Sequence, residues 1–118
     1  ANKIIDELQV KLETKNFENA KQYYKTRNYK SAIIAFENFN KDFPDSKFND
    51  EGMYLKILSQ YNIAINSFQN LQEERFSELI DLYLDFIDKY PNSSFRVEAE
   101  RMYVESLNIL TNFASQKN

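Results

Sequence analysis

A short phrase that can only end a helix occurs twice in this chain and constrains its fold more than any other feature. Residues 42–48 read Asp-Phe-Pro-Asp-Ser-Lys-Phe, and residues 89–95 read Lys-Tyr-Pro-Asn-Ser-Ser-Phe. Neither Pro44 nor Pro91 can continue a helix, because the proline ring removes an N–H donor and crowds the preceding turn. The Ser that follows each Pro can cap the next helix, so each phrase predicts a stop between two helices.

The sequence upstream of the two stops also corresponds. Counted back from each Pro, four further pairs match in type: Tyr29 with Phe76, Ala32 with Leu79, Phe36 with Tyr83, and Phe39 with Phe86. A matched series at a fixed spacing indicates an internal repeat, here of 47 residues from one Pro to the next.

Composition supports an all-α fold. The chain has 118 residues, of which 42% are hydrophobic and 15% aromatic, and this is enough to form the core of one domain. It contains one Gly and two Pro, whereas a sheet of hairpins typically needs Gly or Asn-Gly at its turns. We therefore expect helices alone.

Residue usage also excludes several kinds of chemistry. The chain has no Cys and no His, which rules out disulfides, thiolate zinc sites and the commonest general base. We expect no cofactor, no metal and no catalysis. A net charge of −3 argues against nucleic-acid binding, because phosphate-binding domains usually present a basic face. No apolar run approaches the length of about 20 residues that a membrane span requires.

Apolar residues recur at steps of three and four along most of the chain and predict five antiparallel helices. The expected ranges are 3–26, 29–43, 46–71, 75–90 and 94–114. In the first helix Ile4, Ile5, Leu8 and Leu12 supply the apolar stripe. The third expected helix is unusually long. These ranges form one domain, 1–118, with repeat one at about 3–43, repeat two at about 46–90 and a C-terminal helix at about 94–114. Because the chain starts at Ala1 without Met, we expect it to be a fragment of a longer protein.

This pattern resembles tetratricopeptide repeats, in which a first helix with a small residue pairs with an aromatic-rich second helix that ends at Pro. In repeat one the small and aromatic positions fall on Ala20, Tyr23, Ala32 and Phe36. Counting back from Pro91 puts the corresponding positions on Ser67, Asn70, Leu79 and Tyr83, where Asn70 and Leu79 depart from the family pattern. The fold class predicted is an all-α, tetratricopeptide-like helical-repeat solenoid.

A more specific resemblance comes from the long helices, the aromatic-Pro-Asp/Asn-Ser stops and residues 20–32, Ala-Lys-Gln-Tyr-Tyr-Lys-Thr-Arg-Asn-Tyr-Lys-Ser-Ala. Together these are similar to the C-terminal repeats of the BamD-like outer-membrane assembly lipoproteins. The resemblance implies a non-catalytic scaffold on the periplasmic face of the outer membrane. It would be tethered only through a lipidated Cys upstream of Ala1. The implied partners are a BamA-like barrel-insertion subunit, other assembly lipoproteins and nascent β-barrel clients.

In a solenoid the first helix of each repeat lines the concave face, which is where partners bind. The repeat register predicts a partner-binding surface made of Phe17, Lys21, Tyr24 and Lys25 in repeat one, and of Tyr61, Ala64, Phe68 and Leu71 in repeat two. Aromatic side chains suit peptide binding, since they offer a large contact area and have few rotatable bonds to immobilise. Lys21 and Lys25, with Arg27 and Lys30 nearby, could meet an acidic partner.

Three alternatives stay open. The aromatic residues of this surface could simply pack against adjoining helices. The chain could be a different tetratricopeptide-type adaptor, such as a secretion pilot or an envelope coordinator. A remote alternative is a helical enzyme that uses the acidic stripe of Asp81, Asp85 and Asp88, since paired carboxylates can serve acid/base chemistry.

Overall fold

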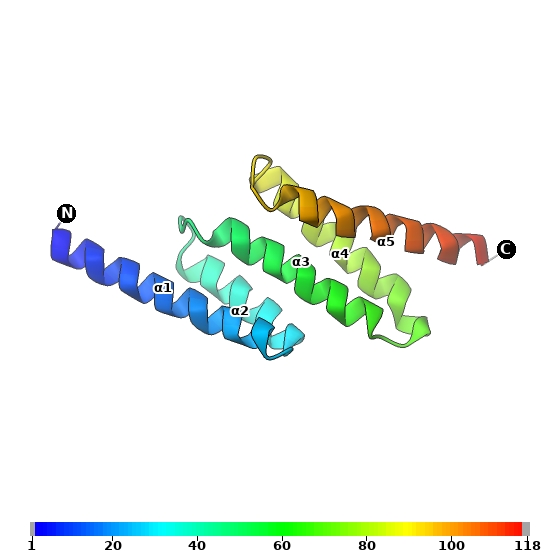
Figure 1. Cartoon of the computed structure of the whole chain (residues 1–118), viewed down its shortest axis with the longest axis horizontal. Coiled ribbons are helices and arrows are strands. Elements are labelled where there is room, and N and C mark those ends of the chain that lie inside the picture. Colours follow the sequence, from blue (N-terminus) through cyan, green and yellow to red (C-terminus); the bar gives the residue numbers. More distant parts are fainter. Residues whose placement is uncertain (1, 117–118) are drawn as a thin grey trace.

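The computed structural model describes residues 2–116 and contains five helices in that range. They are α1 (Lys3–Lys25), α2 (Tyr29–Asp42), α3 (Asn49–Ile65), α4 (Gln69–Lys89) and α5 (Arg96–Gln116). Figure 1 shows successive helices running antiparallel, with α1, α3 and α5 in a near layer and α2 and α4 behind them. The all-α helical-repeat solenoid is therefore confirmed. Ala1 and residues 117–118 of the expected domain lie outside the described residues.

The chain is elongated, as expected for a solenoid. Its radius of gyration is 16.3 Å and its extents are 64 × 28 × 19 Å. A compact domain of this length would have a radius of gyration of about 13.5 Å. Each helix packs mainly on its neighbours in sequence, so core residues are contributed locally along the long axis.

Both predicted stops end a helix in the same way. Phe43 and Tyr90, the residues before Pro44 and Pro91, have φ near −131° in each case. With ψ of 67° and 61°, both residues have left the helical region, which a following Pro disfavours for its neighbour. The N–H of each still donates to the carbonyl four residues back at 2.8 Å, so the helix closes fully before it stops.

The serine after each Pro caps the turn that leads into the next helix. Ser46 Oγ accepts from the N–H of Phe48, and Ser93 Oγ accepts from the N–H of Phe95, both at 3.1 Å. Asn49, the first residue of α3, then ties the stop together, because its Nδ2 donates to the carbonyl of residue 43 at 2.8 Å. The predicted caps are present, although regular α-helix begins three residues later than the cap.

The predicted third helix, residues 46–71, is wrong. Regular helix ends at Ile65, and Asn66–Phe68 form a turn before α4 begins at Gln69 rather than at residue 75. Ser67 Oγ donates to the carbonyl of Ile63 at 2.6 Å and so satisfies one of the free carbonyls at the helix end. The extra length of the second repeat therefore lies in α4, which has 21 residues against 14 in α2.

This correction also changes the register of the second repeat. Ser67 and Asn70 do not occupy the small and aromatic positions of a first helix, because they lie in the turn and in α4. Aligning the ends of α1 and α3 instead pairs Ala20 with Gln60, both buried. Gln60 Nε2 donates to the carbonyl of Arg75 at 2.9 Å, so this polar residue fixes the extended part of α4.

The core has two parts, one under each repeat. The first is built from Phe17, Ala20, Ala32, Phe36, Phe39 and Leu55, and the second from Ile57, Leu79, Tyr83, Phe86, Ala99 and Met102. Tyr54 and Leu58 of α3 pack against both parts. The two repeats are thus continuous through α3.

The first turns of α1 do not pack as the amphipathic pattern predicts. Ile4, Ile5, Leu8 and Leu12 are 54–65% exposed, and α1 extends past the end of α2 in Figure 1. Among the described residues no helix lies over this stripe. The pattern correctly predicts that these residues are helical. The burial that it also predicts is absent, because no second helix covers this stripe in the described residues.

Candidate partner-binding face

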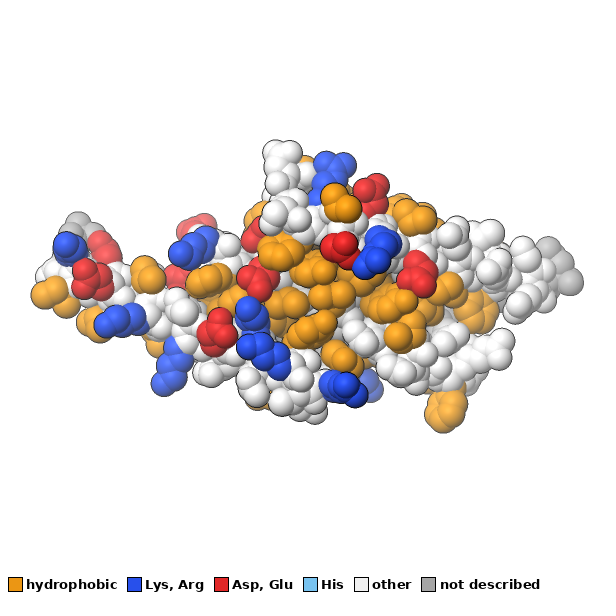
Figure 2. Space-filling model, in the orientation of Figure 1, with side chains coloured by type: hydrophobic (Ala, Val, Ile, Leu, Met, Phe, Trp, Pro, Cys, Tyr) orange, Lys and Arg blue, Asp and Glu red, His pale blue; other side chains and the backbone are white. Residues whose placement is uncertain are grey.

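Three tyrosines lie on the layer formed by α1, α3 and α5, and we call this surface the tyrosine face. It comprises Tyr24 of α1 with Tyr54 and Tyr61 of α3, all partly buried at the edge of the core. Figure 2 shows a band of hydrophobic side chains across this side of the molecule, with charged side chains around it. An apolar centre with a polar rim is typical of protein-binding surfaces.

Contacts between helices make this face continuous. Lys21 Nζ of α1 lies 3.2 Å from a carboxylate oxygen of Glu51 on α3. On the other side of α3, the ring of Tyr54 stacks on Phe95, the residue just before α5, with ring centroids 4.9 Å apart. Tyr61 of α3 also hydrogen-bonds to Glu105 of α5. The three helices therefore present one surface rather than three separate ridges.

The tyrosine hydroxyls stay protonated over a wide range of pH. Burial raises the pKa of Tyr24, Tyr54 and Tyr61, each from the ordinary value near 10. Nearby carboxylates add to this effect, Glu98 at Tyr54 and Glu105 at Tyr61. The neutral hydroxyls can both donate and accept hydrogen bonds, which suits the backbone of a bound chain.

Both signs of charge lie around the face. Glu98 and Arg101 of α5 form an exposed ion pair beside Tyr54. Lys21 and Glu51 form the second pair, at the α1 side. Such a rim contributes more to the choice of partner than to affinity, because exposed pairs are well solvated.

The structure brings together only some of the residues that the repeat register predicts. Lys21, Tyr24 and Tyr61 lie on the tyrosine face, and Lys25 is exposed in the last turn of α1. Phe17 and Ala64 were expected to face a partner but are 1% and 0% exposed. The interior location of Phe17 follows from the rings around it, since it lies within 6 Å of two ring centroids from α2 and stacks on a third from the turn before α3.

Phe68 and Leu71 also leave the predicted surface, because the register correction moves them off α3. Phe68 lies in the turn before α4 and is 82% exposed, while Leu71 is in the first turn of α4 and is half-buried. Tyr54 is the residue that sequence reasoning missed as a surface residue. Its spacing of two helical turns from Tyr61 is the signal that could have found it.

The layer formed by α2 and α4 carries exposed carboxylates and one partly buried lysine at its border with α3. Asp81, Asp85 and Asp88 are exposed along α4, and the described part of the chain has no cluster of three or more potential metal ligands. Lys56 of α3 reaches between α2 and α4, with Nζ 3.7 Å from Glu37. Burial lowers the pKa of Lys56, and the Glu37 carboxylate opposes this shift.

Comparison with known proteins identifies the family of this chain. No curated protein sequence matches the chain. None of the helices in residues 2–116 has the length and apolar character needed to cross a membrane. Residues 9–114 match the model of the YfiO family, which is described as outer membrane lipoprotein. Because this match spans most of the chain, the protein belongs to the YfiO family of outer membrane lipoproteins.

Proposed function

We propose that this chain is a protein-binding scaffold of the machinery that assembles β-barrel proteins in the outer membrane. It binds partner polypeptides on the tyrosine face and carries out no chemistry itself. The family is one of non-enzymatic helical scaffolds at the outer membrane, which supports this assignment.

The observation that carries the proposal is the continuity of the tyrosine face across α1, α3 and α5. Partly buried aromatic rings on a rigid support make good anchors, because little side-chain freedom is lost when a partner covers them. The ring contacts of Tyr54 with Phe95 and of Tyr61 with Phe76 hold two of the anchors in place before binding.

The partners follow from the resemblance to BamD-like lipoproteins. They are the periplasmic domains of a BamA-like barrel-insertion subunit, other assembly lipoproteins and nascent β-barrel clients. The chain would act on the periplasmic face of the outer membrane. Its attachment there would rest on a lipid anchor outside residues 1–118.

A pair of charge-swap variants tests this proposal. The face variant combines Lys21→Glu with Glu105→Lys, at the two ends of the tyrosine face, and leaves the net charge unchanged. The control variant combines Lys41→Glu with Asp88→Lys, both exposed and at equivalent positions of α2 and α4. Binding of each to the purified periplasmic domain of a BamA-like subunit is measured by titration calorimetry, after circular dichroism has verified the helical fold.

We expect the face variant to bind at least about tenfold more weakly, because each reversed charge repels the partner group that the wild-type charge would face. The control should bind as wild type does. Equal binding by all three proteins would refute the tyrosine face as the docking surface. Absence of binding by wild type would refute the barrel-assembly role and favour a different envelope adaptor.

A further inference from the structure

A second charged surface lies at the corner where α1 turns into α2. Residues 19–36 contain four cations, Lys21, Lys25, Arg27 and Lys30, and no acidic residue. Lys21 is paired with Glu51, but the other three are exposed and have no ion-pair partner among the described residues. We call Lys25, Arg27 and Lys30 the basic corner.

The backbone of the basic corner is fixed. Arg27 has a positive φ of 64°, and its N–H donates to the carbonyl of Tyr24 at 3.0 Å. The N–H of Asn28 donates to the carbonyl of Tyr23 at 2.8 Å, which completes a Schellman-type helix end. Because the turn is closed by its own hydrogen bonds, the backbone positions that carry the three cationic side chains are fixed relative to one another.

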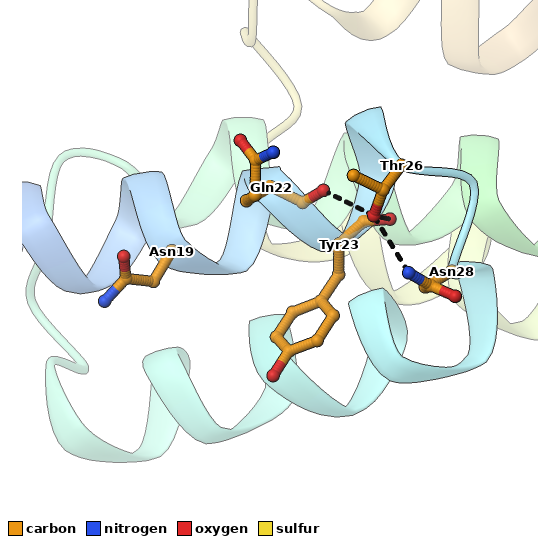
Figure 3. A pocket seen from close by; sticks show the side chains of 5 residues that line it. All are labelled: Asn19, Gln22, Tyr23, Thr26 and Asn28. Atoms are coloured by element: carbon orange, nitrogen blue, oxygen red, sulfur yellow. Dashed lines mark hydrogen bonds between the residues drawn. The ribbon is translucent and has the colours of Figure 1, made fainter.

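A pocket of about 420 Å³ lies at the same helix end, lined by residues that alternate in sequence with these cations. Figure 3 shows the five side chains that line it. It is lined by Asn19, Gln22, Tyr23, Thr26 and Asn28. The ring of Tyr23 is 46% exposed, and the side-chain amides of Asn19 and Gln22 have no hydrogen-bond partner among the described residues. Each amide offers both a donor and an acceptor, the set that a peptide backbone requires.

We propose that the basic corner and its pocket bind an acidic segment of a partner protein in an extended conformation. The cations pair with its carboxylates, and the amides of the pocket bond to its backbone. This site is separate from the tyrosine face and goes beyond the proposed scaffold function, since it specifies the chemistry of a second partner.

A peptide fits this surface better than a membrane does. Basic clusters that recognise anionic lipids usually hold about four to eight Lys or Arg residues, whereas the corner has three on a chain of net charge −3. Anionic headgroups also offer mainly hydrogen-bond acceptors, whereas the amides of the pocket present acceptors as well as donors. An extended polypeptide can satisfy both parts at once.

The test uses a short fluorescent peptide that alternates Glu and Ser, together with a matched peptide that alternates Gln and Ser. The corner variant carries Lys25→Gln, Arg27→Gln and Lys30→Gln. A control with the same charge change carries Lys3→Gln, Lys11→Gln and Lys41→Gln, all exposed and remote from the corner. Binding is followed by fluorescence anisotropy and mapped by amide chemical-shift changes.

We expect the acidic peptide to bind wild type and to bind the corner variant about tenfold more weakly, because three surface ion pairs are lost. The control should change binding by less than about twofold, and the shifts should fall on residues 19–30. The proposal is overturned if neither peptide binds or if both bind equally. It is also overturned if the two variants lose affinity equally. Corner-dependent binding to phosphatidylglycerol vesicles, with no binding of the acidic peptide, would replace it with a membrane contact. None of these results depends on whether a BamA-like subunit binds the tyrosine face.

Discussion

The single glycine of the chain offers a sharp test of the packing described above. Gly52 is buried in the first turns of α3 and has an ordinary negative φ, so its backbone does not require glycine. A Cβ at this position would lie 3.5 Å from Cε1 of Phe17 and 3.6 Å from Cδ1 of Phe36. Both distances are ordinary van der Waals contacts. The C-terminal helix α5 has Ala99 at the equivalent position after the second stop, fully buried.

Gly52→Ala should therefore stabilise the protein. Replacing Gly by Ala inside a helix contributes about 1 kcal/mol, because the unfolded chain loses freedom and helix formation costs less. The added methyl group makes van der Waals contact with both rings and displaces neither. For a domain of this size, about 1 kcal/mol corresponds to a rise in melting temperature of about 4 °C.

The assay is thermal and urea unfolding followed by circular dichroism, with two companions. Ala99→Gly should lower the free energy of unfolding by about 1.5 kcal/mol, since it loses both the helix preference and a buried methyl group. Gly52→Leu should cost about 1–3 kcal/mol, because its extra carbons have to enter space held by the two Phe rings. A loss of stability in Gly52→Ala would show that these rings cannot tolerate a Cβ, and the packing argument would fail.

Three further predictions follow from local geometry. Arg27→Gly should raise the free energy of unfolding by about 0.5–1 kcal/mol in urea titration, because φ at this position is 64°, and an unchanged or lower value would contradict the strain argument. Asn49→Ala should lower it by about 2 kcal/mol, since a buried side chain that bonds two carbonyls of the first stop is lost, and a loss below about 0.5 kcal/mol would count against that role. Stability should fall as pH rises above about 10, because the pKa values of the tyrosine face are raised and the unfolded chain loses its phenolic protons first. The lowered pKa of Lys56 acts in the opposite direction, but it is one residue against three tyrosines. A urea midpoint that does not change between pH 9 and 11 would contradict this expectation.

The helix stops were predictable from sequence because their causes are local. Pro44 and Pro91 restrict their own backbone and that of the residue before, whatever surrounds them. The serine caps likewise act within two residues of themselves. The break at Asn66–Phe68 was missed because it contains neither Pro nor Gly. Asn-Ser does occur there, as it does after Pro91, and this is the signal that a search for Pro alone overlooks.

The candidate site was only partly predictable, because exposure is set by tertiary packing. Lys21, Tyr24 and Tyr61 could be assigned from helical spacing alone. Phe17 has the same spacing relative to Lys21 that a surface residue would have, yet its ring stacks on Phe48, which is brought close only when the chain folds back after the first stop. The burial of one aromatic rather than another depends on such contacts between distant segments.

The helices of the solenoid are joined along two edges, and the two repeats are alike at one edge and different at the other. At the end that carries the stops, Ser93 Oγ donates to Asp50 Oδ2 at 2.9 Å and links the second stop to the start of α3. At the opposite end, which Figure 1 shows carrying both short turns, the repeats differ, because α4 is 7 residues longer than α2. The basic corner and the exposed ring of Phe68 both lie at this end. Because α2 and α4 end in the same way at the stops, the extra residues of α4 lie at this opposite edge, and surface features can differ between repeats there without altering the stops.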